Sequence, residues 1–145
     1  MQRPPRHHEL RLDPSVAQWT VQALTRLLAT FALVQGASII VGGPGRWRGP
    51  AFALALTAPG APASWGVALL LCGGVALGCT FANAHTGTFW SMLALGTWAL
   101  FFAVSFAVTA MRNPHAATTG VWAYFTFSIA SCTLGSAYRQ SRGGI

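Results

Sequence analysis

A long stretch without any acidic or basic side chain constrains this fold more than any other feature of the sequence. Residues 65–111 contain no Asp, Glu, Lys or Arg, and strongly turn-forming residues interrupt them only at 83–87. A helix rises about 1.5 Å per residue, so about 20 apolar residues cross about 30 Å of hydrocarbon. Because backbone polar groups in lipid must pair within their own segment, the stretch predicts two membrane-spanning helices, at about 65–82 and 88–111.

The composition of the whole chain agrees with a membrane protein. Of its 145 residues, 53% are hydrophobic and 8% are charged, whereas a soluble domain carries about 25% charged residues. The nine basic residues are all arginines and lie at the ends of apolar runs, not among aromatic residues on one face. The net charge of +7 therefore indicates anchoring at the lipid bilayer and no nucleic-acid partner.

The other apolar runs complete an all-α prediction, an integral membrane bundle of four transmembrane helices within residues 14–138. The first span covers about 21–42 and follows an amphipathic extension, which starts at Asp13-Pro14 with a capping carboxylate and a proline. The fourth span covers about 121–138, and residues 1–13 and 139–145 are expected to form basic, flexible tails. Residues 51–58 are too short to cross the bilayer, and we expect a short interfacial helix there, with a re-entrant segment as the alternative.

Small residues recur at every fourth position in two of the predicted spans. These helix-packing candidates are Gly74, Gly78 and Ala82 in the second span and Ser128, Cys132 and Ser136 in the fourth. Small side chains let two helix backbones approach closely in lipid, where van der Waals contact drives association. The spacing does not distinguish packing within one subunit from packing between subunits.

Arginines and one tryptophan mark the points where the predicted spans meet the lipid headgroups. These interface anchors are Arg26, Arg46, Trp47, Arg48, Arg112 and Arg139. Arg26 is expected to snorkel to the headgroups, with a place in the lining of a water-filled pore as the alternative. Four spans would put five arginines on the side of both termini and three on the other side, which favours the cytoplasmic membrane with the N- and C-termini in the cytoplasm.

The sequence offers little material for catalysis. Glu9 and Asp13 are its only acids and lie outside the predicted spans, and His85 and His115 would lie on opposite faces of the membrane. Ion-coupled transporters usually carry ionisable groups at the midplane. The chain also lacks a phosphate-binding loop, an H-E-x-x-H pair and a nucleophile elbow. We expect no enzyme, no catalytic residue, no cofactor and no metal site.

Several loop and anchor motifs resemble small four-span membrane proteins of phages that infect actinobacteria. The motifs are Trp47, Gly49-Pro50-Ala51-Phe52-Ala53, the segment 59–66 and the segment 113–124. The likeness covers about residues 34–139. Some of these phage proteins accompany endolysins and are considered holins or holin-like. The resemblance implies a homo-oligomer that opens the host membrane during lysis, and no site residue transfers with it.

Three functions stay open. The first is a holin-like protein that oligomerises and permeabilises the cytoplasmic membrane. The second is a regulatory or superinfection-exclusion protein that binds another membrane protein, with residues 51–58 as the contact. The third is a passive channel or carrier for a small neutral solute, since a midplane without charge counts against ion coupling only.

Overall fold

Four α-helices and two short 3-10 turns make up the described chain. The computed structural model describes residues 14–47, 52, 54–112 and 119–140. The elements are α1 (Pro14–Gly42), the turn η1 (Pro44–Trp47), the turn η3 (Ala55–Thr57), α2 (Ala63–Phe81), α3 (His85–Arg112) and α4 (Thr119–Gln140). No strand occurs among these residues, and the all-α prediction is confirmed.

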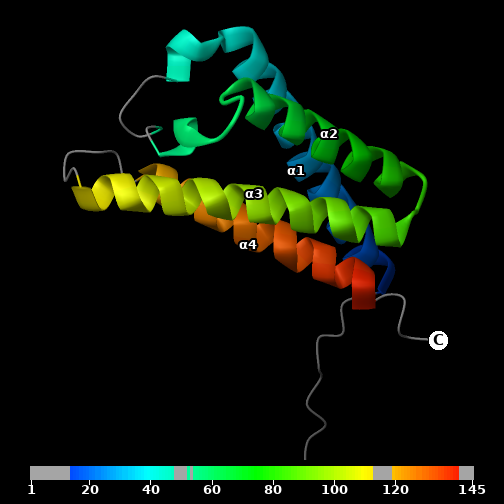
Figure 1. The fold of residues 1–145 in the computed structure, drawn as a ribbon. Helices are drawn as coiled ribbons and strands as arrows, with labels where there is room; N and C mark the ends of the chain where they lie inside the picture. The colour runs from blue at the N-terminus through cyan, green and yellow to red at the C-terminus, as the bar shows by residue number, and fades with distance from the viewer. Residues whose placement is uncertain (1–13, 48–51, 53, 113–118, 141–145) are drawn as a thin grey trace, which may run out of the picture.

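The helices form a bundle in which sequence neighbours run antiparallel (Figure 1). The start of α1 and the end of α4 lie at one end of the bundle, together with the turn between α2 and α3 (Figure 1). The two 3-10 turns lie at the opposite end (Figure 1). This arrangement gives the bundle a terminal end, which carries both ends of the described chain, and a loop end.

α1 joins the predicted amphipathic extension and the first predicted span in one continuous helix of 29 residues. It begins at Pro14, because proline is favoured in the first helical turn, where its missing N–H is no loss. The predicted cap, Asp13, lies outside the described residues. α1 ends at Gly42, and Gly43 then takes a φ of 63°, a left-handed conformation that glycine adopts without steric cost.

The turn between α2 and α3 is shorter than the sequence suggested. The third predicted span was expected to begin at Thr88, but α3 begins at His85 and the turn is confined to residues 82–84. Asn83 has a φ of 52°, and the Ala84 N–H donates to the Cys79 carbonyl at 2.8 Å. This is a Schellman motif with asparagine in the left-handed position. It closes α2 within three residues, which leaves His85 free to start the next helix.

Three helices are long and apolar enough to cross a membrane, namely Ser15–Gly42, Ala63–Phe81 and His85–Arg112. The second and third predicted spans coincide with two of these helices to within three residues, and the first ends at the same residue but starts six residues later than the helix. α4 has 22 residues, but its many serine and threonine side chains lower its hydropathy. By length and composition the structure therefore contains three candidate spans instead of the four expected, and the fourth stays a prediction.

The outer surface of the bundle is strongly apolar. Large hydrophobic side chains are exposed on all four helices, and Val41 and Met111 are 86% and 84% exposed. Soluble monomers seldom expose apolar side chains over so much of their surface. The exterior thus suits a lipid environment.

The core is richest in aromatic rings toward the loop end. Phe102 is 2% exposed, and its ring centroid lies 4.9 Å from that of Trp65 and 4.3 Å from that of Trp98. Tyr124 of α4 packs on the same ring at 5.4 Å and stacks on Phe106 at 5.5 Å. These contacts join α2, α3 and α4 and account for the alignment of α4 along α3.

In place of the interfacial helix predicted at 51–58, the described residues of this segment form a shorter element. The turn η3 is formed there and ends at Thr57, because the residue before Pro59 is disfavoured in a helical conformation and the proline cannot continue the helix. Ala55 is fully buried, and the Phe52 ring meets the Phe106 ring edge-on at 5.1 Å. The segment therefore packs against the loop end of α3.

Candidate functional site

The contact between α1 and α2 is made by backbone against backbone. A Cβ added at Gly36 would lie 2.8 Å from the Gly66 carbonyl oxygen, and one added at Gly66 would lie 2.8 Å from the Gly36 oxygen. A Cβ at Gly73 would lie 2.9 Å from the Ala29 oxygen. Since these separations leave no room for a side chain, the three glycines set the distance between the two helices.

The contact between α3 and α4 uses residues of the predicted small stripe in the fourth span. The Ser128 hydroxyl donates to the Gly96 carbonyl at 2.8 Å and links the two helices. A Cβ at Gly96 would lie 2.6 Å from the Cys132 sulfur, so Cys132 packs directly on the α3 backbone. Ser136 is exposed and its hydroxyl donates to the Cys132 carbonyl of its own helix. The structure thus brings Ser128 and Cys132 into the bundle and leaves Ser136 at its surface.

The predicted small stripe of α2 lies on the outside of the described chain. A Cβ at Gly74 or at Gly78 would meet no described atom within 4 Å, and Ala82 is exposed. Leu71, on the exposed side of the same helix, is 64% exposed. Gly66 and Gly73, which make the contact with α1, were not among the predicted packing residues, although Leu69, Gly73 and Ala76 recur at helical spacing on the buried face.

Two of the predicted anchors lie at the terminal end and stack on aromatic rings. The Arg26 guanidinium lies 4.7 Å from the centroid of the Phe81 ring, at the end of α2, and its buried Nε has no hydrogen-bond partner among the described residues. The Arg139 guanidinium lies 6.0 Å from the centroid of the Phe89 ring. Both contacts are of the cation–π kind.

Three other predicted anchors lie at the loop end. Arg46 and Arg112 are exposed, and Trp47 is half-buried with its ring edge-on to Phe52 at 5.1 Å. Arg48 lies outside the described residues. Arginine thus marks both ends of the bundle.

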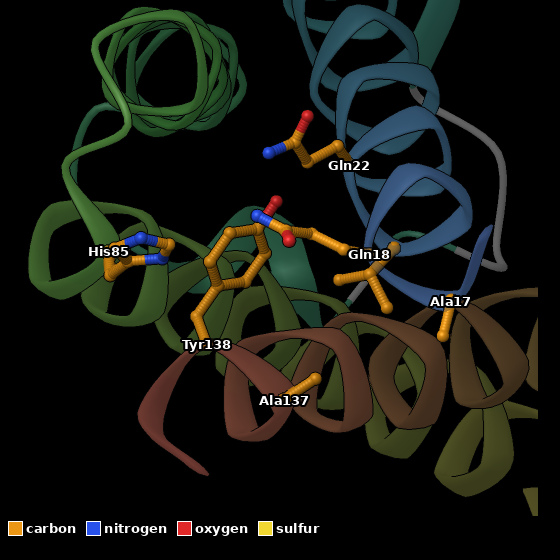
Figure 2. Close-up of a pocket in the computed structure, with 7 residues that line it drawn as sticks. Ala17, Gln18, Gln22, His85, Ala137 and Tyr138 are labelled. Atoms are coloured by element: carbon orange, nitrogen blue, oxygen red, sulfur yellow. The ribbon is translucent and has the colours of Figure 1, made fainter. Parts of the chain in front are cut away.

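The seam between α1 and α4 is more loosely packed than the α1–α2 and α3–α4 contacts. The two helices touch at few points, and three cavities follow one another along them. The cavity at the terminal end has a volume of about 420 Å³ and is lined by Ala17, Gln18, Val21, Gln22, His85, Ala137 and Tyr138 (Figure 2). Cavities of about 290 and 210 Å³ continue toward the loop end.

Recognisable catalytic chemistry is scarce in the described part of the chain. No group of three His, Cys, Asp or Glu side chains there is placed to hold a metal ion, and Glu9, Asp13 and His115 lie outside the described residues. What the described residues offer is close helix packing, an outward small-residue face and a partly polar crevice. Comparison of the chain with protein-family models, with curated proteins and with solved structures finds no match.

Proposed function

We propose that this protein is an integral membrane protein of four spans that self-assembles in the cytoplasmic membrane and permeabilises it in the manner of a holin. The observation that carries the proposal is the outward face of α2, where Gly74 and Gly78 have no partner within the described chain. A small-residue face of this kind is suited to close contact with another helix in lipid. Contact of this face with the same face of a second copy gives an isologous pair.

The length and packing of α4 support the fourth span. Its 22 residues extend over about 33 Å, enough to cross the hydrocarbon. α4 follows α3 along its whole length, with Gly120 beside Phe106 near one end and Arg139 over Phe89 near the other. Because α3 is long and apolar enough to cross, a helix packed alongside it lies at the same depth. No charged residue lies between Thr119 and Tyr138.

The packing of the bundle interior favours a lesion between subunits over a channel through one subunit. Phe102, Trp65, Trp98 and Tyr124 fill the space between α2, α3 and α4 with aromatic rings. A water-filled path through such a core would require repacking of close-packed side chains. An opening formed between outer faces of neighbouring subunits leaves the core intact.

The test is inducible expression in an actinobacterial host with a voltage-sensitive dye, with and without a co-expressed endolysin. The wild-type protein should depolarise the membrane soon after induction and let the endolysin lyse the cells. Gly78→Leu should accumulate to the same level, because the position is open, yet depolarise less, by about fivefold or more for the loss of about 1 kcal/mol at an interface. Val75→Leu, a similar enlargement at an exposed position of α2 that already carries a side chain, is the matched control and should behave as wild type.

An absence of depolarisation would mean that the outward face of α2 binds a partner other than a second copy of this chain. If high expression leaves potential and growth unchanged, with or without endolysin, self-assembly into lesions is the wrong function. The same outward glycine face also fits a helix of another membrane protein, which is the regulatory or exclusion hypothesis.

Orientation has its own test. Arg26 and Arg139 lie at the terminal end, which the arginine count of the whole chain assigns to the cytoplasm. A reporter fused after Gly144 should be cytoplasmic, and one inserted at Gly60 should be external. The reversed pair would show that the four-span topology with both termini inside is wrong.

A further inference from the structure

The seam between α1 and α4 changes from polar to apolar along its length. The cavity at the terminal end lies between the first turns of α1 and the last turn of α4. The next cavity is lined by Leu24 and Leu28 of α1 and by Thr133 and Leu134 of α4, and the third reaches Phe31 and the aromatic core. The three cavities are separate but follow one another along the α1–α4 seam, with polar residues at the terminal end, called here the mouth, and mainly apolar residues beyond it. Together they are called the crevice.

Polar side chains from three helices converge at the mouth of the crevice. Figure 2 shows the Gln18 amide beside the Tyr138 ring, the His85 ring on the other side of Tyr138, and Gln22 above them. The His85 and Tyr138 ring centroids are 5.7 Å apart. His85 Nδ1 is buried and has no hydrogen-bond partner among the described residues. A buried polar atom without a partner destabilises the structure, so a polar group in the cavity would be favoured.

Two arginines lie at the terminal end of the bundle, Arg26 one helical turn after Gln22 and Arg139 directly after Tyr138, although neither lines the cavity itself. Arg26 stacks on Phe81 and Arg139 stacks on Phe89, the rings that precede and follow His85 by four residues. α3 begins at His85, which puts the positive end of its helix dipole at the mouth. No acidic residue occurs in the described part of the chain. A negatively charged group is therefore the complementary ligand.

We infer that this crevice binds one anionic phospholipid, with the headgroup in the terminal cavity and one acyl chain along the seam. From Gln18 to Phe31 α1 rises about 20 Å. That distance accommodates a headgroup and the acyl chain of one leaflet, which is half of the roughly 30 Å hydrocarbon layer. The apolar continuation distinguishes a lipid from a soluble phosphate. The inference requires the membrane location but not self-assembly through α2.

Native mass spectrometry tests whether the crevice binds an anionic phospholipid. The full-length protein is placed in nanodiscs that hold equal amounts of phosphatidylglycerol and phosphatidylcholine, and the lipids that stay bound after its release are identified. One phosphatidylglycerol per chain should be retained in preference to phosphatidylcholine. Arg26→Gln or Arg139→Gln should each lower that preference about fivefold, because one arginine near an anionic headgroup is worth about 1 kcal/mol. Arg112→Gln removes the same charge at the loop end and should leave the preference unchanged.

A second pair of variants separates the acyl chain from the headgroup. Thr133→Trp puts a large ring into the middle cavity and should reduce retention of both lipids. Thr126→Trp, at an exposed position elsewhere on α4, should not. Equal retention of the two lipids, or an equal loss with Arg112→Gln, would mean ordinary surrounding lipid and overturn the inference.

Two further results would also overturn it. One is displacement of the lipid by soluble glycerol phosphate at the same concentration, which would show that the site recognises phosphate alone. The other is a lipid-free dimer that Thr133→Trp dissociates, which would assign the seam to a second copy of the chain.

Discussion

Gly73 and Gly74 are neighbours in sequence and lie on different faces of α2, about 100° apart around its axis. A Cβ at Gly73 would lie 2.9 Å from the Ala29 carbonyl oxygen of α1, whereas a Cβ at Gly74 would meet no described atom within 4 Å. The first glycine is required by a packed helix pair, and the second has no such role within the described chain. A small residue in a membrane helix thus permits close approach, but its neighbours in space decide whether another helix is there.

The contacts of α1 with α2 and with α4 show, for whole helices, that small residues permit close approach and large ones prevent it. Toward α2, α1 presents Gly36 and Ala29, and the backbones meet. Toward α4 it presents Leu24, Leu28 and Phe31, which line cavities instead of interlocking closely. Bulky side chains hold the second pair of helices apart. The tight seam is structural, and the loose one has room for a ligand.

The largest expected difference between the two faces of α2 concerns folding. Gly73→Leu should destabilise the bundle by about 3 kcal/mol or more, because overpacking against a backbone atom cannot be relieved by a side-chain shift. Gly74→Leu should leave folding unchanged. The folded fraction of each variant in a denaturing-detergent titration measures this, with the level in membranes as a second readout. Equal loss in both variants would mean that the two faces are packed alike.

A smaller effect is expected between subunits. Gly78→Leu should weaken self-association by about fivefold or more, since a bulky side chain at a close helix contact removes about 1 kcal/mol or more of binding free energy. Cross-linking in membranes at matched abundance measures the oligomeric fraction, and Val75→Leu is the control at a position that already carries a side chain. Unchanged cross-links would show that the outward face of α2 meets only lipid.

The smallest effect extends the comparison to two serines of α4. Ser128→Ala removes the hydrogen bond to Gly96 of α3 and should cost about 0.6 kcal/mol, the average for such bonds inside membranes. Ser136→Ala removes a bond within its own helix at the surface and should change stability little. The difference in unfolding free energy between the two variants is the measurement. A larger loss of stability for Ser136→Ala than for Ser128→Ala would mean that Ser136, and not Ser128, lies on the packed side of α4.

Much of the secondary structure could be predicted because it depends on local chemistry. The proline at position 14 and the long uncharged runs placed the start of α1, its end at residue 42 and both ends of α2 to within two residues. The start of α3 was missed by three residues, since it depends on Asn83 adopting a left-handed conformation. For residues 51–58, hydrophobicity suggested a helix, but residues 55–57 form a 3-10 turn that ends shortly before Pro59.

The candidate site was predictable only in part, because a shared face does not identify a partner. The small stripe of the fourth span contains Ser128 and Cys132, which contact α3, and Ser136, which does not. The polar mouth of the α1–α4 crevice was not foreseen. Its residues come from the start of α1, the start of α3 and the end of α4, and no spacing in the sequence connects them.

The sequence by itself determined that the chain is helical and that three of its helices are apolar enough for lipid, since both follow from composition and from the need to satisfy backbone polar groups within each segment. Only the tertiary structure decided which side of each helix is buried. In lipid the exterior of a bundle is as apolar as its interior, so hydrophobic patterning carries little directional information. Which side of a helix faces the interior is decided instead by how closely it packs against its neighbours. For this reason Gly73 packs against α1 while Gly74 faces outward.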